Sequence, residues 1–345
     1  VCGICSTAHA ICAAYTQQQV FQVQPTPAGQ ALTNLIFMAD IIQNHLRHFY
    51  LLVAPYYVKG PDISPFAPRQ GDYRLPDRLN AELVDHIKQG AMMAARAHEA
   101  LAIFGAKAPH QQTVMATGVT EQASSDQLVA YRSIIREIKT FVDKVYLPDV
   151  QIIGEFYPEY HRLGASPGNF MSYGWFPNPV TGEPAFRQGI MRNATDLQPV
   201  RTDQVRNHLR YRWYAGDNPQ TIDGGQPAQA QPDKPDAYSW VKAPRYQDVP
   251  MESGPLARGW INGYYRQGLG AMDRIMARAI ETRQICRLAE ETVEQIAPGS
   301  PTLRPYNVPP SGKGLGLTDS MRGTLSHFIT VDNGRVTGYR LITPT

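Results

Sequence analysis

The sequence is poor in cysteine, has no long hydrophobic run and carries no strong excess of charge of one sign. Four cysteines in 345 residues are too few for the disulfide framework of a small secreted domain. No run of about 18 apolar residues occurs, so no segment is expected to span a membrane by itself. The 33 basic and 30 acidic residues give a net charge of only +3, without the concentrated basic stripe that is typical of nucleic-acid-binding proteins. What remains is a globular chain, 43% apolar, that can bury a large core.

The spacing of the apolar residues predicts a mainly helical fold. Apolar residues recur at three- and four-residue steps in long stretches, which predict helices over Ala8–Phe21, Leu32–Val53, Ala81–Phe104, Leu128–Val145 and Leu269–Ile296. We expect Ser6 or Thr7 to cap the first of these helices and Gly105 to stop the third. The fourth helix is expected to end before Pro148.

Short segments rich in turn-forming residues separate these helices. Residues Gly154–Pro199 are rich in Gly, Pro and aromatic residues and predict small β-hairpins, and Asn218–Ala237 predicts an exposed loop. Two strand-like runs within Leu325–Leu341 flank a turn at Asp332–Gly334. No fixed-period repeat is present. The sequence therefore predicts one mainly α domain over residues 1–345, a large helical bundle with small β-hairpin appendages.

The four cysteines fall into two kinds. Cys12 and Cys286 lie among apolar neighbours in helical patterns, which predicts buried, unreactive thiols. Cys2 and Cys5 form a CxxC motif directly before a helix, where two sulfurs can reach one metal centre and the helix N-terminus favours the thiolate. A zinc ribbon would need a second ligand pair nearby, and a thioredoxin-like pair would need an α/β pattern. The motif alone leaves both a metal site and a redox pair open.

Three further stretches combine Pro or Gly with charge outside the long helices, which is how sites are usually lined. Taken singly, each is equally well explained as a capped, solvated loop. They are Gly105–His110 leading to Thr117–Thr120, Lys242–Tyr246 leading to Glu252–Arg258, and Thr318–His327.

In this order and spacing, the cysteine motif and the three stretches resemble the large-subunit family of nickel–iron hydrogenases over nearly the whole chain. The resemblance implies a nickel and an iron bridged by cysteine sulfurs, with CO and cyanide on the iron. Cys2 would be a terminal nickel ligand that takes part in catalysis, and Cys5 would bridge the two metals. Thiolates suit this role because they are soft ligands that can bridge two metals. The implied reaction is the reversible heterolytic cleavage of H2.

The resemblance also implies roles for two residues outside the cysteine motif. Arg322 would point into the metal site, hydrogen-bond the cyanide nitrogens through its planar fork and assist proton removal. A nearby carboxylate such as Asp319 would hold it in place. His110 would lie beside the site and orient a ligand or a group facing the electron exit, the alternative being a histidine of a surface loop.

A partner is implied because the chain has no cysteine cluster of its own for iron–sulfur centres. Electrons would pass to a separate iron–sulfur small subunit in an obligate heterodimer, across an interface of more than about 2,000 Å². The segments Cys2–His9 and Lys107–His110 are expected near that interface. The compartment stays open among cytoplasmic, membrane-associated through partners, and periplasmic by export with the small subunit.

The chain departs from the family pattern in several places. A second cysteine pair, a magnesium site near the C-terminus, an upstream Glu that relays protons and an Arg before the first motif have no counterpart, which is expected of a sequence truncated at both ends. Asn44 stands where many members carry Asp, Gln111 where a second Pro is usual, and Thr117 where the first of two glycines is usual.

Other readings of the sequence remain. A hydrogen-sensing subunit would keep the same site and signal through a partner. A non-catalytic scaffold, like the quinone-site subunit of respiratory complex I, shares the fold, but the presence of Cys2 and Cys5 argues against it. A thiol–disulfide oxidoreductase would need only these two cysteines and would leave the other three stretches unexplained.

Overall fold

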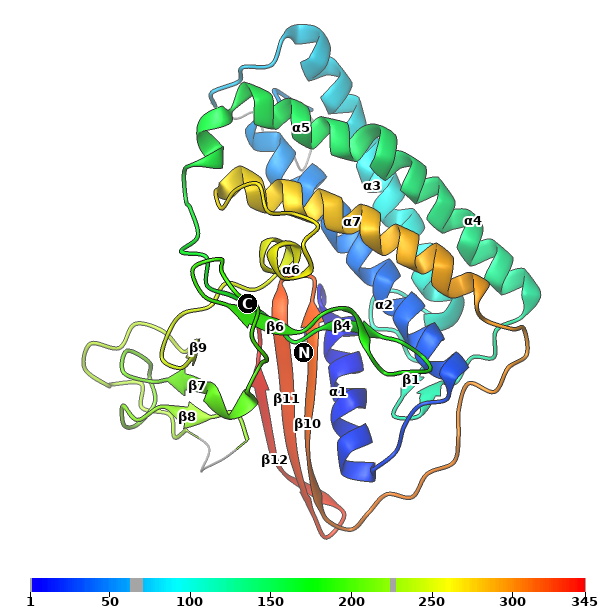
Figure 1. Cartoon of the computed structure of the whole chain (residues 1–345), viewed down its shortest axis with the longest axis vertical. Helices are drawn as coiled ribbons and strands as arrows, with labels where there is room; N and C mark the ends of the chain where they lie inside the picture. The colour runs from blue at the N-terminus through cyan, green and yellow to red at the C-terminus, as the bar shows by residue number, and fades with distance from the viewer. Residues whose placement is uncertain (1, 63–70, 224–227, 345) are drawn as a thin grey trace.

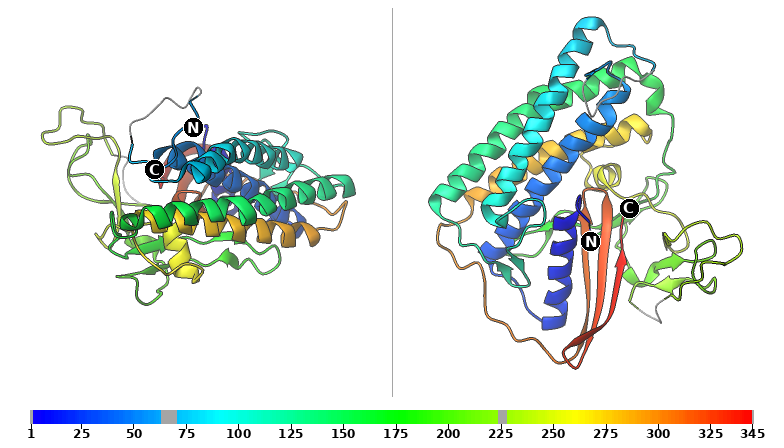
Figure 2. Two further views of the ribbon diagram at one scale, coloured as in Figure 1. Left: turned by 90° about the horizontal axis from the view of Figure 1, so that it is seen from above. Right: turned by 180° about the vertical axis from the view of Figure 1, so that it is seen from behind.

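The computed structural model describes residues 2–62, 71–223 and 228–344. Its long helices lie side by side in a bundle, with a three-stranded sheet and the first helix below it (Figures 1 and 2). The α-helices are α1 (Ser6–Phe21), α2 (Pro27–Arg47), α3 (Asp77–Gly105), α4 (Ser125–Phe141), α5 (Leu147–Phe156), α6 (Pro255–Asn262) and α7 (Ala271–Glu294). The predicted class, mainly α with small antiparallel sheets, is confirmed. None of the helices within the described ranges is both long and apolar enough to cross a membrane.

Helix α2 is the central helix of the bundle. It begins at Pro27, after Thr26, whose side chain accepts a hydrogen bond from the backbone N–H of Gly29. Every residue from Gly29 to Leu46 is buried, which is typical of a helix surrounded by other elements on all sides. Several polar side chains on α2 are therefore carried into the interior, where burial is unfavourable unless they find partners or serve a function.

Two long helical segments contain a π-helical turn. In the first, the sequence predicted an uninterrupted helix, and in the second it predicted the end of a helix. A π turn at His48–Val53 follows α2 and leads into a 3₁₀ turn at Ala54–Tyr56. A second π turn, Val142–Tyr146, joins α4 to α5. The prediction that this helix ends before Pro148 was wrong. Pro148 lies in the first turn of α5, where its missing N–H is not needed.

The ends of two other helices differ from the prediction. Cys5, and not Ser6 or Thr7, occupies the N-cap position of α1, and no side chain caps this end. Ser6 instead lies in the first turn, where its hydroxyl accepts a hydrogen bond from the backbone N–H of His110. Helix α3 ends at Gly105, as expected, and the chain turns away at Ala106, which has a φ of 66°.

The long sheet consists of β10 (Gly312–Ser320), β11 (Gly323–Asp332) and β12 (Arg335–Ile342), antiparallel and in that order. The turn at Asp332–Gly334 between two strands is confirmed, whereas β10 was not predicted. Helix α1 packs along β10 (Figure 1). A Cβ atom on Gly316 would lie 2.5 Å from the carbonyl oxygen of Cys12, so this glycine allows the helix to approach the strand closely.

Two-stranded pairs and a second three-stranded sheet make up the remaining strands, as the turn-rich segments predicted. The pairs are β1 (Val114–Met115) with β2 (Gly118–Val119), β3 (Phe170–Ser172) with β6 (Gly189–Met191), and β4 (Trp175–Pro177) with β5 (Pro184–Phe186). The sheet orders β8 (Gln220–Thr221), β7 (Val205–His208) and β9 (Ala243–Tyr246). The predicted loop Asn218–Ala237 thus contains a short strand, and part of this prediction, residues 224–227, lies outside the described residues.

The two cysteines that were predicted to be unreactive are fully buried and free. Cys12 and Cys286 each have 0% of their surface exposed, and burial raises the pKa of both thiols. Neither sulfur contacts solvent, so neither thiol can meet an incoming reactant, and both stay protonated at neutral pH. Both are structural residues.

One buried histidine makes the fold sensitive to acid. Burial and the neighbouring His9 lower the pKa of His327 to about 3, whereas an unfolded histidine titrates near ~6.5. Below about pH 6.5 the unfolded chain therefore binds a proton that the folded chain does not, so stability falls as the pH falls. Between pH 7.5 and 5 we expect His327 to account for a loss of about 2 kcal/mol in the free energy of unfolding.

Urea unfolding of His327→Gln at the two pH values checks this expectation. The variant should lose about 2 kcal/mol less than the wild type on going to pH 5. His110→Gln is the control, because the His110 side chain is exposed. An unchanged pH dependence in His327→Gln would contradict the assignment.

Candidate metal centre

The start of α1, the turn between β10 and β11, and α6 meet at one end of the long sheet (Figures 1 and 2). Cys2 and Cys5 lie at this meeting point. The backbone N–H of Cys5 donates to Sγ of Cys2 at 3.3 Å, so the loop between them curls and brings the two side chains together. Cys5 is buried, with 8% of its surface exposed, and Cys2 is half-buried.

The two thiols differ in acidity. Burial tends to raise the pKa of Cys2, but hydrogen bonds from Cys5 and the backbone, together with the charge of Arg322, lower it below its ordinary value. For Cys5, burial and the adjacent Cys2 raise the pKa to about 12. Cys2 is thus the more acidic of the two thiols, and Cys5 holds a proton that a metal cation can displace.

Arg322 lies in the turn between β10 and β11 and is half-buried. Its positive charge lowers the pKa of Cys2 and opposes the rise at Cys5 and at Asp40, which places the guanidinium on the side of the cysteine pair. The residues that flank it are packed: Met321 and Leu325 expose 2% and 1% of their surface. The turn is therefore anchored on the core, close enough to the cysteine pair for the charge of Arg322 to act on both sulfurs.

A buried carboxylate on α2 faces the same region. Asp40 is 3% exposed, and one of its oxygens accepts a hydrogen bond from the Gln43 side chain at 3.1 Å. The other oxygen, Oδ2, has no hydrogen-bond partner among the described residues. Burial raises the pKa of Asp40 to about 7. A buried acceptor without a partner beside two thiols fits a site that a further group completes.

The three departures from the family pattern each make a hydrogen bond that the usual residue could not make. The Asn44 amide donates to the carbonyl oxygen of Ile4, between the two cysteines, at 3.3 Å, whereas a carboxylate cannot donate. The Gln111 side chain accepts from two backbone N–H groups, those of Thr113 and Val114, both at 2.9 Å. The Thr117 hydroxyl donates to a backbone carbonyl at 2.9 Å. Of these contacts, the one made by Asn44 holds the backbone between the two cysteines.

The structure places His110 at the surface. Its side chain is exposed, while its backbone N–H donates to the Ser6 hydroxyl at 3.2 Å. The Lys107–His110 segment therefore lies against the start of α1, next to Cys5. That both segments face a partner subunit stays a prediction. The His110 imidazole itself lies on the outer side of this contact.

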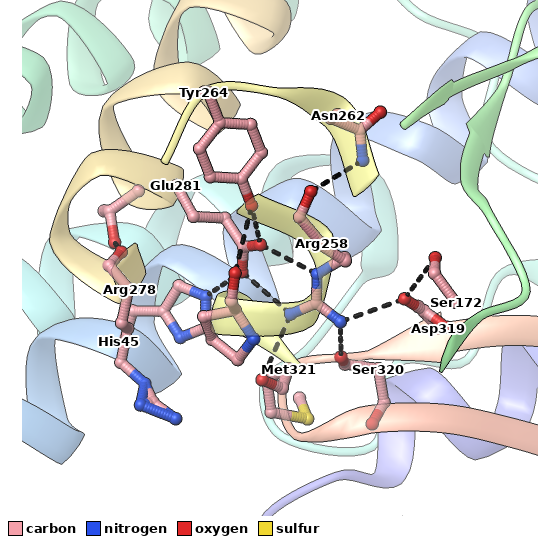
Figure 3. Close-up of polar contacts among 12 residues, drawn as sticks. His45, Ser172, Arg258, Asn262, Tyr264, Arg278, Glu281, Asp319, Ser320 and Met321 are labelled. Atoms are coloured by element: carbon pink, nitrogen blue, oxygen red, sulfur yellow. Dashed lines mark hydrogen bonds and ion pairs between the residues drawn. The ribbon is translucent and has the colours of Figure 1, made fainter. Parts of the chain in front are cut away.

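A buried ion network lies behind the turn that carries Arg322 (Figure 3). Arg258 on α6 is 0% exposed and makes ion pairs with Glu281 of α7 and Asp319 of β10. Burial alone would lower the pKa of the Arg258 guanidinium. The adjacent Glu281 carboxylate outweighs this effect, so that the pKa lies above its ordinary value. Asp319, which was expected to hold Arg322, is instead paired with Arg258. The expected Asp319–Arg322 pair was therefore wrong, and Asp319 pairs with the fully buried Arg258.

Sequence reasoning did not identify Glu281 or Arg258 individually. Arg258 closes the Gly-Pro-Leu-Ala-Arg stretch, but nothing in the sequence shows that its side chain points inward. For Glu281 a signal was present, because it shares a four-residue step with Ala277 and Ile285 on the buried face of α7. A carboxylate on an otherwise apolar helix face predicts a buried partner.

The residues around Cys2 and Cys5 fit part of a metal site with thiolate ligands. Within the described ranges, no group of three or more His, Cys, Asp or Glu side chains is placed to hold a metal ion. Cys2 and Cys5 supply two adjacent soft donors, and the unpartnered Asp40 oxygen and the Arg322 guanidinium face them. Two adjacent thiols beside an arginine, in a helical bundle, are a donor set that suits a soft metal ion.

Comparison with known proteins gives the family. The family model described as nickel-dependent hydrogenase matches residues 1–64, 55–269 and 264–345, and the chain belongs to this family. The periplasmic [NiFeSe] hydrogenase large subunit of Desulfomicrobium baculatum is 30% identical, over 100% of this chain and 74% of that protein. The hydrogenase-2 large chain of Escherichia coli (strain K12) is 22% identical, over 100% of this chain and 78% of that protein.

Solved structures agree with this result. The oxidised Ni-Fe-Se hydrogenase of D. vulgaris Hildenborough superimposes with a TM-score of 0.94 at 30% identity, covering 99% of this chain and 77% of that chain. The chain thus corresponds to the large, catalytic subunit of a nickel–iron hydrogenase, which pairs with a small subunit.

Proposed function

We propose that Cys2 and Cys5 hold the nickel–iron centre of this hydrogenase, Cys2 as a terminal nickel ligand and Cys5 as a bridge between the two metals. The observation that carries the proposal is the thiol pair at the start of α1, in which the pKa of Cys2 is lowered beside Arg322. When bound, the centre would supply the site at which H2 is cleaved heterolytically into a proton and a hydride, and the hydride would yield a second proton and the two electrons that leave. CO and cyanide would complete the coordination of the iron, and a magnesium ion would bind near the C-terminal end of the family's large subunits.

The protein's own residues would bind the centre, orient its ligands and exclude water from it. Arg322 offers five N–H donors in a fixed fork, which suits the cyanide nitrogens and keeps a positive charge where a proton must leave. Asn44 holds the Cys2–Cys5 loop through the Ile4 carbonyl, so that the two sulfurs keep their spacing. Buried neighbours such as Met321 keep bulk water from the back of the site.

The electrons leave through iron–sulfur clusters of the small subunit. The contact between Ser6 and His110 brings the two segments that were expected at this interface together at the surface. We propose that this surface faces the partner and that the exposed His110 imidazole lies at the electron exit. The two subunits form an obligate heterodimer.

Infrared spectroscopy of the complex, isolated through a tag on this chain, tests the proposed function. We expect the stretching bands of metal-bound CO and cyanide, and nickel in about one equivalent per chain with iron in excess because the partner carries clusters. Matured complex that contains nickel but shows no such bands would contradict the proposed iron ligands. A stable, fully active large subunit without any partner would contradict the electron route.

A further inference from the structure

Two of the sequence stretches that mark this family touch each other through their glycines. Gly254 has a φ of 106°, and a Cβ atom at this position would lie 2.7 Å from the carbonyl oxygen of Arg322. Gly323 has a φ of 142° and would collide with Ser253 if it carried a side chain. Only glycine allows two backbones to approach this closely. The segment before α6 therefore lies directly against the turn that carries Arg322.

Arg258, one turn into α6, uses all the hydrogen-bond donors that a guanidinium has (Figure 3). Two bonds go to the Glu281 carboxylate, from Nε at 2.7 Å and from Nη2 at 2.8 Å. The other three end on the β10–β11 turn: Nη1 donates to Asp319 Oδ2 at 3.1 Å and to the Ser320 carbonyl at 3.0 Å, and Nη2 donates to the Met321 carbonyl at 3.4 Å. Three consecutive residues directly before Arg322 are thus tied to one side chain.

The guanidinium is itself fixed from behind. Glu281 also accepts hydrogen bonds from His45 of α2 at 2.9 Å and from the Tyr264 hydroxyl at 2.6 Å. The indole ring of Trp175 lies 4.2 Å from the Arg258 carbon Cζ, at cation–π distance. Helices from the centre of the bundle therefore hold Arg258, and Arg258 holds the turn.

Arg322 depends on this arrangement for its position. Within the described residues, its guanidinium has no hydrogen-bond partner, and its backbone N–H donates to the Ser320 hydroxyl at 3.3 Å. The direction of its side chain is therefore set by where the backbone of the turn lies. Buried ion pairs contribute little net stability compared with well-packed apolar groups. Stability alone therefore does not explain why Arg258 makes three hydrogen bonds to the residues before Arg322.

We propose that Arg258 is a positioning residue for the reaction, which fixes the β10–β11 turn and so holds Arg322 against the Cys2–Cys5 pair. This inference rests on the role proposed for Arg322. Lysine is the informative substitution, because it keeps a positive charge between Glu281 and Asp319. Its single ammonium group cannot reproduce the five bonds of the fork.

The test uses the matured two-subunit enzyme with Arg258→Lys, Arg322→Lys, the double variant and a control. Arg136→Lys is a matched control, because Arg136 pairs with Glu290 on the outer face of the bundle, away from the turn. The measurements are kcat and KM for H2 with an artificial electron acceptor, bound nickel, and backbone amide hydrogen exchange of the peptide that covers residues 317–324. Exchange reports on the turn independently of activity.

In Arg258→Lys we expect bound nickel and KM to stay within about twofold, kcat to fall about tenfold, and exchange at the turn to quicken at least about tenfold. If Arg258 acts through Arg322, the double variant should be no slower than Arg322→Lys alone, because the two changes remove one function. If Arg258→Lys does not fold, Asp319→Asn, which keeps the side-chain shape, should show the same pattern more weakly.

Several results would overturn the proposal. Unchanged exchange at residues 317–324 would show that Arg258 does not hold the turn. Multiplicative losses in the double variant would show that the two arginines act separately. Nickel lost in proportion to activity would assign Arg258 to the fold in general. Wild-type turnover in Arg322→Lys would remove the role proposed for Arg322, and the positioning role with it, even where exchange shows a loosened turn.

Discussion

Replacing Cys5 by serine is expected to abolish hydrogen-dependent dye reduction and to lower the nickel bound by the matured complex. A serine hydroxyl is a hard oxygen donor that stays protonated at neutral pH, whereas a bridge between two metals requires a soft, electron-rich thiolate. Cys5 lies at the N-cap of α1, 3.3 Å from Cys2 through its backbone N–H, so the change alters the donor atom and leaves the loop intact. Cys2→Ser should have the same effect.

Cys286→Ser provides the control for this experiment. Cys286 is 0% exposed on α7 and shares no hydrogen bond with the cysteine pair. It should keep its nickel and its rate per nickel, with at most a modest loss of stability. The measurements are dye reduction under H2 and metal analysis of the purified heterodimer. Full activity in Cys5→Ser would remove this residue from the metal centre.

Replacing Arg322 by lysine is expected to lower turnover at least about tenfold, or ~1.4 kcal/mol of barrier, with the metals still bound. Lysine keeps the charge that lowers the pKa of Cys2, so the metal site should still assemble. What it loses is the planar fork, which can donate to two acceptors at once. The expected result is therefore a lower kcat at nearly constant nickel content.

Arg335→Lys is the matched control for Arg322→Lys. Arg335 begins β12 of the same sheet, next to the Asp332–Gly334 turn, and its side chain is exposed. Its substitution should leave turnover unchanged. Turnover of Arg322→Lys at the wild-type rate would make Arg322 a structural residue only, and the donors that face the cysteine pair would have to be sought elsewhere.

The sequence by itself determined the family and which residues are candidates for the chemistry. The CxxC motif before a helix, the Pro- and Gly-rich stretches and their order gave the family, and the periodicity of apolar residues gave the long helices. These signals are local: a helix face, a cap or a turn is set by residues within a few positions of one another. Predictions from these signals were wrong where a residue is compatible with two local structures. Pro148, for example, predicted a helix end but lies in the first turn of α5.

Only the tertiary structure decided how these residues support one another. Nothing in the sequence pairs Asp319 with Arg258, or places Glu281 and His45 behind them, because these contacts join residues 23 to 236 positions apart. From the sequence, a charged side chain on a helix is predicted to face solvent, and only the fold shows whether other elements cover it. Once it is buried, it must find a partner of opposite charge, and that partner is set by which elements pack together. The candidate site residues thus lie in short sequence motifs, whereas the buried network around Arg258, which we propose to position Arg322, depends on how α2, α6 and α7 pack together.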